Sequence, residues 1–491
     1  MSADAPQGAC GSEALRAEGR ADPEMLARMR ADYPVGPHDK PQSMCPAFGS
    51  LRTGLRMRRV GTILSGSACC VYGLSFVSHF YGARRSVGYV PFDSETLVTG
   101  KLFEDIREAV HDMADPDRYD AIVVTNLCVP TASGVPLRLL PDVIDGVRII
   151  GIDVPGFGVP THAEAKDVLA GAMLARAAQE VREGAVPRPD GIDGRPSVAL
   201  VGEMFPADPV MIGAMLAPMG LAAGPVVPCR EWRELYGALD CAAAAAIHPF
   251  YTDTFRQFTR AGRTLIPSAP VGLDGTMDWL GRVGDAYGVA ADRVDTARAA
   301  MGGAIRGALE GARIEGTITV SGYEGSELLV ARLLIESGAH VPYVGTACAR
   351  SAMSEPDRDW LEAKGAKVQF RASLEDDLSA VDAVKPDLAI GTTPVVQHAK
   401  EAGIPSLYFT NLISARPLMG PAGAGSLQEV VRAAMGNRER MGRMKAFFAG
   451  VGTGDATGVH AGMPNLRPDY RAANQKRLDK KARAAKAAEM I

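Results

Sequence analysis

Short apolar runs alternate with helical patterns along most of this chain, and this alternation restricts the fold more than any other feature. Val60–Leu64, Ala121–Thr125 and Thr317–Ser321 are typical of buried strands, whereas Lys101–Met113 places apolar residues on one helical face. Strands that alternate with helices form parallel sheets covered by helices on both faces. The sequence therefore predicts an α/β protein built from Rossmann-like units.

The chain is too long for one hydrophobic core. Its 491 residues suit about three domains of roughly 150 residues each. A segment rich in Pro, Gly and charge at 184–196 is typical of a linker. The predicted divisions are a weakly structured N-terminal arm (1–42), three α/β domains (43–190, 191–312 and 313–466) and a polar, basic C-terminal tail (467–491).

Several local elements follow from periodicity. We expect a short helix at Pro23–Arg30, a helix at Leu137–Ile144, a strand at Ser406–Thr410 and one long helix at Ser426–Met444. The structure tests the last three of these predictions.

Charge and composition exclude some classes of function and location. The formal net charge of −4 does not indicate nucleic-acid binding, for which an excess of positive charge is typical. No apolar run reaches the roughly 18–20 residues of a membrane span. The first 40 residues lack the apolar region of a signal peptide. We expect a cytoplasmic protein, in which the eight cysteines do not form a disulfide framework.

Three thiol positions lie on predicted loops. Cys69 and Cys70 are adjacent on a Gly/Ser turn after the Val60–Leu64 strand, Cys45 lies 25 residues before Cys70, and Cys128 lies 58 residues after it. A closed zinc site usually takes paired ligands two to four residues apart. Single, widely separated cysteines suit an iron–sulfur cluster held between units, although only three are well placed and a cubane needs four. Buried, inert cysteine remains the alternative.

The cysteine pattern resembles that of a known family. Cys45, the turn at 65–70 and Cys128 are similar to the cluster-binding positions of the catalytic components of nitrogenase-like oxidoreductases, the component 1 type. The segments 385–391 and 403–405 of the third unit add to the resemblance. It implies three α/β units and a 4Fe–4S cluster bound by these three cysteines, with a fourth ligand from a partner chain. Cys69 is then a neighbour of the cluster or an alternate ligand.

Two further segments, Gly88–Glu95 and Val320–Glu327, resemble subunit Y of the branch of this family that reduces chlorophyllide a. The resemblance implies a heterotetramer of two Y subunits and two sister subunits Z. It also implies a transient, ATP-hydrolysing iron–sulfur subunit X as electron donor. The implied reaction reduces the C7=C8 double bond of ring B of chlorophyllide a in bacteriochlorophyll biosynthesis, and the chain is active only with its partners.

The chain departs from nitrogenase itself at one position. Nitrogenase holds its molybdenum–iron cofactor through a Cys and a His, but Thr410–Asn411 stands where that His is expected, and neither Cys229 nor Cys241 aligns convincingly with the Cys. This departure favours a cavity for an organic pigment. Three alternatives remain: an N-type subunit of light-independent protochlorophyllide reductase acting on ring D, a non-catalytic cluster scaffold, and a metabolite-binding α/β protein with inert cysteines.

Other motifs carry less information. No G-x-x-x-x-G-K-[ST] loop occurs, and 322–325 is a weak phosphate signal, so we expect no nucleotide to be bound by this chain. His248 ends a predicted strand next to Phe250 and Tyr251. A structural role is expected for His248, with a magnesium ligand or a proton donor as the alternative.

Overall fold

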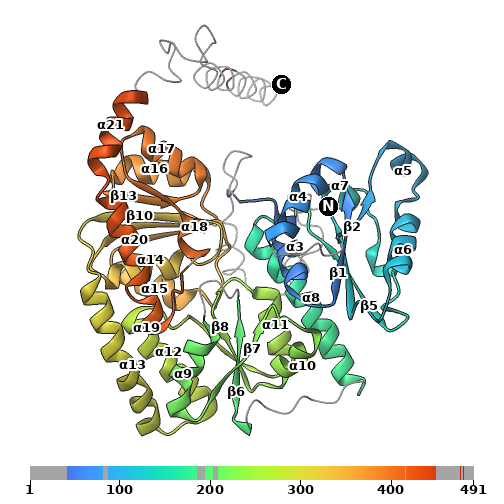
Figure 1. Ribbon diagram of the computed structural model, residues 1–491, viewed down its shortest axis with the longest axis horizontal. Helices are drawn as coiled ribbons and strands as arrows, with labels where there is room; N and C mark the ends of the chain where they lie inside the picture. Colours follow the sequence, from blue (N-terminus) through green and yellow to red (C-terminus); the bar gives the residue numbers. More distant parts are fainter. Residues whose placement is uncertain are drawn as a thin grey trace, which may run out of the picture.

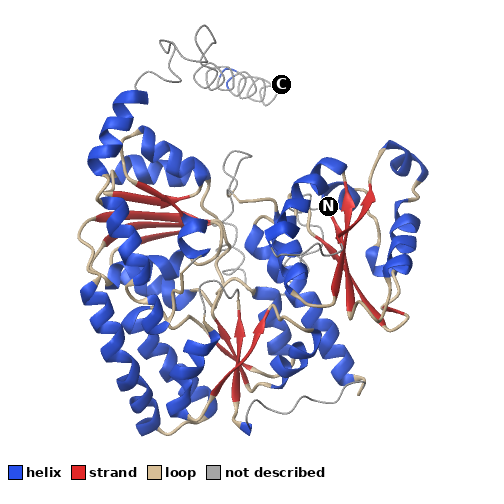
Figure 2. Ribbon diagram, viewed as in Figure 1, coloured by secondary structure: helices blue, strands red, loops and turns tan. Residues whose placement is uncertain are grey.

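The computed structural model describes residues 41, 43–80, 87–184, 194–202, 208–414, 416–448, 476 and 479. Three sheets with flanking helices surround a common centre, the first at the right, the second at the bottom and the third at the left (Figures 1 and 2). Every strand pairing is parallel except one at the edge of the first sheet. The predicted fold class of three Rossmann-like units is confirmed, and the exact domain limits stay predictions.

The first unit carries the loops with the candidate cysteines. Its elements are α3 (Pro46–Arg56), β1 (Val60–Gly66), α4 (Ala68–Phe80), β2 (Val87–Pro91), α5 (Ser94–Thr99), α6 (Leu102–Met113), β3 (Ala121–Asn126), α7 (Cys128–Ala132), a 3₁₀ turn (Leu137–Leu139), β4 (Val143–Ile144), β5 (Val147–Asp153) and α8 (His162–Arg182). The strand order is β2-β1-β3-β5-β4. Ser65 at the end of β1 pairs with Asn126 at the end of β3, so both strands finish at the same edge of the sheet.

The second unit is a four-stranded sheet with the order β7-β6-β8-β9. Its elements are β6 (Ser197–Val201), α9 (Pro209–Leu216), a 3₁₀ turn (Ala217–Met219), β7 (Ala222–Val227), α10 (Trp232–Asp240), β8 (Ala243–Ala246), α11 (Thr252–Arg260), β9 (Thr264–Ile266), α12 (Gly272–Tyr287) and α13 (Ala291–Gly311). Buried residues of its strands and helices belong to two cores, one shared with the first unit and one with the third.

The third unit is a five-stranded sheet with the order β12-β11-β10-β13-β14. Its elements are β10 (Thr317–Gly322), α14 (Glu327–Glu336), β11 (His340–Thr346), α15 (Glu355–Ala363), β12 (Lys367–Phe370), α16 (Leu374–Val384), β13 (Leu388–Gly391), α17 (Thr393–Glu401), β14 (Ser406–Tyr408), α18 (Phe409–Ser414), α19 (Gly420–Gly423), α20 (Ser426–Met435) and α21 (Arg438–Phe448).

The carboxyl ends of the three sheets meet. A Cβ atom built on Gly325, which follows β10, would lie 3.0 Å from Cδ2 of Phe250, which follows β8. The same atom would lie 3.7 Å from Cβ of Ala163, at the start of α8 beyond β5. Strand order reverses within each sheet, between β1 and β3, β6 and β8, and β10 and β13. Ligands of α/β proteins bind outside the carboxyl ends of strands at such reversals, so this junction is where a substrate is expected.

The helix predicted at Leu137–Ile144 is wrong. Pro141 forces Leu140 into an extended conformation, with φ −64° and ψ 145°, after one 3₁₀ turn. The segment ends as β4, which pairs with β5 through the two-residue turn Asp145–Gly146. Both turn residues have positive φ, 49° and 85°, as a type I′ hairpin requires.

Two boundaries in the third unit also differ from prediction. The strand predicted to reach Thr410 ends at Tyr408, because Tyr408 pairs with Gly391, the last residue of the neighbouring strand β13. The helix predicted at Ser426–Met444 is two helices, α20 and α21, which are separated at Gly436–Asn437. Glycine disfavours a continuous helix by about 1 kcal/mol relative to alanine.

Some predictions lie outside the described residues. These are the arm at 1–42 except residue 41, including the helix at Pro23–Arg30, most of the linker at 184–196, and the tail at 467–491 except residues 476 and 479.

Candidate metal centre

Cys45 lies at the start of α3 and is exposed. It occupies the N-cap position, and Pro46 follows at the first helical position, where its fixed φ suits a helix start. The buried face of α3 packs against α8. A Cβ atom on Gly49 would overlap the carbonyl oxygen of His162, so the absence of a side chain at Gly49 permits this close approach. The position of Cys45 is thus set by the contact between α3 and α8.

Cys69 and Cys70 lie in the first turn of α4, directly beyond the end of β1, and both are exposed. The N–H of Cys70 donates to the carbonyl oxygen of Ser67 over 3.0 Å. A Cβ on Gly66 would lie 2.6 Å from a methyl group of Leu127, the residue before Cys128. A glycine at the end of β1 therefore brings the turn with Cys70 against the loop with Cys128.

Cys128 is the first residue of α7, after β3, and is half-buried. Its Sγ accepts a hydrogen bond of 3.1 Å from the backbone N–H of Gly156, in the loop after β5. Hydrogen bonds to ligating sulfurs are one of the ways in which proteins tune cluster potentials. Cys128 thus already has a donor of the kind found around cluster thiolates.

The thiols at the three positions influence one another electrostatically. The pKa of Cys70 is raised by partial burial first, then by Cys69, and also by the charges of Cys45 and Cys128. Partial burial and the charge of Cys128 raise the pKa of Cys45 against an opposing hydrogen bond from Ala47. Several thiolates within reach of one another are unfavourable without a cation, and a bound metal reverses this by deprotonating its thiols. The donor set therefore suits a thiolate-bound metal group.

In the part of the chain that the structure describes, no three or more His, Cys, Asp or Glu side chains gather so that they could hold a metal ion. A mononuclear site needs its ligands around one point. In a cubane each thiolate binds a different iron, so the sulfurs are spread around the cluster. The assignment of Cys45, Cys70 and Cys128 to a 4Fe–4S cluster stays a prediction.

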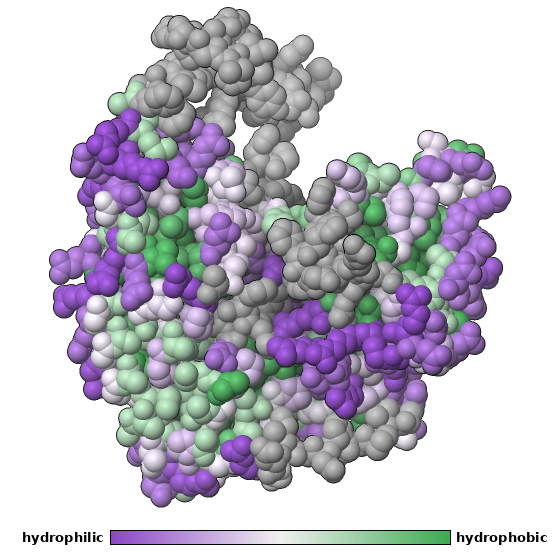
Figure 3. Space-filling model, in the orientation of Figure 1, coloured by the Kyte–Doolittle hydropathy of each residue, from purple (hydrophilic) through white to green (hydrophobic). Residues whose placement is uncertain are grey.

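Large apolar side chains of the first unit are exposed on the elements that carry these cysteines, on β2 and in the loop after β5. They are Met44, Tyr72, Tyr89, Val129 and Phe157, with exposed fractions between 37% and 70%. Figure 3 shows hydrophobic side chains at the upper right, in the region where Figure 1 places β1 and β2. Exposed apolar groups gathered beside one site are typical of a surface that binds another protein.

The other described cysteines are buried. Cys229 and Cys348 are fully enclosed, and burial raises the pKa of each thiol well above its usual value. Cys241 is also buried, beside Ser197. His248 is 4% exposed, and its ring stacks on that of Tyr251.

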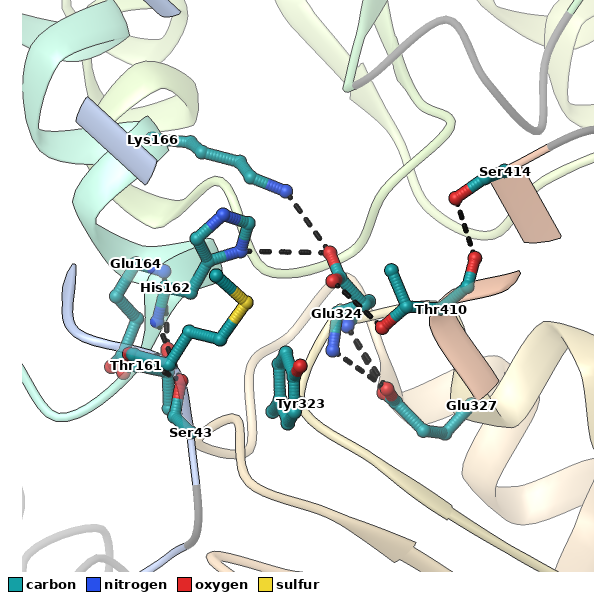
Figure 4. Close-up of polar contacts among 12 residues, drawn as sticks. Ser43, Thr161, His162, Glu164, Lys166, Tyr323, Glu324, Glu327, Thr410 and Ser414 are labelled. Carbon is teal, nitrogen blue, oxygen red and sulfur yellow. Dashed lines mark hydrogen bonds and ion pairs between the residues drawn. The ribbon is translucent and has the colours of Figure 1, made fainter. Parts of the chain in front are cut away.

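A buried ionic group that the sequence did not reveal lies between the first and third units (Figure 4). Nζ of Lys166 lies 3.2 Å from Oε2 of Glu324, and Nδ1 of His162 lies 3.5 Å from the same oxygen. The side chains are 1–4% exposed. Two features of the sequence could have pointed to this ionic group. His162 and Lys166 are four residues apart on one face of α8, and Glu324 lies in the turn at 322–325.

None of the helices in the described ranges combines the length and apolar character that crossing a bilayer requires.

Comparison with known proteins agrees with the fold. The family model described as nitrogenase component 1 type oxidoreductase matches residues 45–435. A chlorophyllide reductase 52.5 kDa chain of Cereibacter sphaeroides is 74% identical over 97% of this chain and 95% of its own length. The chain of the same name from Rhodobacter capsulatus is 70% identical over 99% of this chain and its full length.

More distant similarities extend across the family. Subunit N of a light-independent protochlorophyllide reductase from Jannaschia sp. is 26% identical over 41% of this chain and 48% of its own length. A solved structure, nitrogenase Cp1 at pH 6.5, superposes with a TM-score of 0.64 at 16% identity, over 82% of this chain and 93% of that one. This chain belongs to the nitrogenase component 1 type oxidoreductases.

Proposed function

We propose that this chain is the Y subunit of a chlorophyllide a reductase, an oxidoreductase of bacteriochlorophyll biosynthesis. The observation that carries the proposal is identity of 70–74% to two chlorophyllide reductase chains over nearly the whole length. The reaction is reduction of the C7=C8 bond of ring B of chlorophyllide a. The meeting point of the three sheets offers a junction between units, the kind of place in which an organic ligand binds.

Cys45, Cys70 and Cys128 would hold a 4Fe–4S cluster, with a fourth ligand from the partner chain and Cys69 beside it as a neighbour or alternate ligand. When bound, the cluster supplies one-electron transfer at low potential. The chain's own contributions are the three thiols, the N–H of Gly156 on the Cys128 sulfur, and an apolar rim that a partner would cover and shield from water.

The proposed assembly contains two Y and two sister Z subunits in the cytoplasm. Subunit X hydrolyses ATP and delivers single electrons. The absence of a P-loop motif from the sequence supports a division of labour in which this chain binds no nucleotide.

The test is anaerobic co-purification with candidate Z subunits, followed by iron and pigment analysis and by turnover with X, ATP and either chlorophyllide a or protochlorophyllide. The proposal predicts an iron-containing complex and a bacteriochlorin product reduced at ring B. Reduction of protochlorophyllide at ring D instead would identify an N-type subunit. An iron-loaded complex that reduces neither pigment would indicate a scaffold, and a complex without iron would indicate inert cysteines.

A further inference from the structure

The hydroxyl group of Ser43 joins the loop that carries Cys45 to the start of α8 (Figure 4). Its oxygen accepts a hydrogen bond of 2.9 Å from the backbone N–H of His162, the first residue of α8. The same hydroxyl donates to the carbonyl oxygen of Met44 over 3.1 Å. That carbonyl group belongs to the peptide unit that includes the backbone nitrogen of Cys45. One hydroxyl therefore connects the end of a helix to the peptide bond next to a proposed cluster ligand.

The start of α8 has a defined position because the third unit holds it through two ionic contacts. Arg371, which follows β12, binds both carboxylate oxygens of Glu164, at 2.6 and 2.7 Å. Oε2 of Glu324 lies 3.5 Å from Nδ1 of His162 and 3.2 Å from Nζ of Lys166. These contacts are made by the first residues of α8, so the N–H group at its start is well fixed.

The segment around Cys45 is attached on both sides. Before it, Pro41 forms an antiparallel bridge with Ser373 of the third unit. After it, α3 begins directly, and Gly49 of this helix packs against the carbonyl group of His162. The hydroxyl contact lies between these two attachments, closest in sequence to the thiol. It is therefore the contact best placed to fix the peptide unit in front of Cys45.

Helix capping alone does not account for this contact. A cap normally comes from the residue directly before the helix. In α8 that residue is Thr161, whose side chain already accepts a hydrogen bond from the N–H of Glu164. Ser43 is 119 residues away from His162 in sequence, so its hydrogen bond holds two distant segments together.

We propose that Ser43 is a positioning residue for Cys45, which keeps this thiol in place for the iron–sulfur cluster. The inference rests on the proposed function, in which Cys45 is a cluster ligand. Groups that do not touch a metal can orient its ligands and so contribute to metal affinity. Ser43 acts through the backbone, because its hydroxyl donates to the carbonyl group of Met44.

The test measures how fast bathophenanthroline disulfonate, a ferrous-iron chelator, removes iron from anaerobically purified complexes with their partner subunits. Ser43→Ala deletes the hydroxyl, whereas Ser43→Thr keeps one. A single hydrogen bond typically changes an equilibrium by about 3- to 10-fold. We expect Ser43→Ala to release iron about 3–10 times faster than wild type and to show altered visible absorbance. Ser43→Thr should behave like wild type in both measurements.

Ser354→Ala is the matched control. Oγ of Ser354 also accepts a backbone N–H and donates to a carbonyl oxygen, both of Ser351, over 3.1 and 2.8 Å. Ser354 lies directly before α15 in the third unit, away from the cysteine loops. Its substitution should lower the melting temperature without changing the rate of iron release.

Three results overturn the proposal: iron release from Ser43→Ala at the wild-type rate, equally fast release from Ser43→Thr and Ser43→Ala, or equal acceleration in Ser354→Ala. The last result would show that any loss of stability releases iron. A wild-type complex that contains no iron overturns the cluster assignment itself, which separates failure of the proposed function from failure of this inference.

Discussion

Oγ of Ser43 accepts a hydrogen bond of 2.9 Å from the backbone N–H of His162. Ser43 lies two residues before Cys45, and His162 is the first residue of α8, the helix that also carries Lys166. The loop with a proposed cluster ligand is therefore tied directly to α8, the helix whose Lys166 pairs with Glu324 of the third unit.

Gly49→Ala tests the packing that positions Cys45. The new methyl group would overlap the carbonyl oxygen of His162, a backbone atom that cannot turn away. Overpacking of this kind costs about 1–3 kcal/mol. We expect thermal unfolding to show that loss, and iron bound after anaerobic purification to fall because α3 and Cys45 are displaced.

Gly303→Ala is the control for that substitution. Gly303 lies on the exposed face of α13, with no atom within 4 Å of a new Cβ. Alanine should stabilise this helix by about 0.5–1 kcal/mol. Equal stability changes in the two variants would contradict the packing argument.

Glu180 links the first and second units through a buried hydrogen-bond network. It accepts hydrogen bonds from Arg148 at 2.6 Å and Trp232 at 3.2 Å, and from the hydroxyl of Tyr236. Glu180→Ala removes the carboxylate partner of Arg148 and the acceptor of the Tyr236 hydroxyl, so we expect a loss of about 3 kcal/mol in the free energy of unfolding. Tyr236→Phe removes one donor and should cost about 1 kcal/mol. Similar losses in denaturant titrations of the two variants would refute this ranking.

Asp377 makes stability depend on pH. Burial raises the pKa of its carboxyl group from 3.8 to about 8, and the group is paired with the hydroxyl of Tyr343 at 2.9 Å. The folded state then binds one more proton than the unfolded state between these values, so stability falls as pH rises through that window. We expect Asp377→Asn to flatten the decline in melting temperature between about pH 5 and pH 8. An unchanged slope would show that Asp377 is ionised in the folded protein.

Much of the fold follows from sequence periodicity. The strands predicted at Val60–Leu64, Ala121–Thr125 and Thr317–Ser321 begin at the predicted residues and extend one or two residues further. Predicted elements were wrong where contacts with other strands decide the local structure. The hairpin at Asp145–Gly146 depends on pairing with β5, and the end of β14 depends on the length of β13.

The candidate sites were predictable to different degrees. Cys70 and Cys128 stand out because thiols on loops after strands are unusual, and parallel strands bring such loops to one edge. Cys45 lies on the loop before α3, ahead of the sheet. The pair of Lys166 and Glu324 is 158 residues apart in sequence and forms only when two units meet. No local pattern marks a charged pair of that kind as buried.

The central claim is that cysteines from three loops bind one iron–sulfur cluster in this chain. The most direct measurement is the iron content and visible absorbance of anaerobically purified complexes that carry Cys70→Ala or Cys128→Ala, with Cys241→Ala and Cys348→Ala as controls. The account predicts that the first two variants lose the cluster absorbance and pigment reduction, while the buried-cysteine variants keep both. Full iron content and turnover in either Cys70→Ala or Cys128→Ala would contradict it.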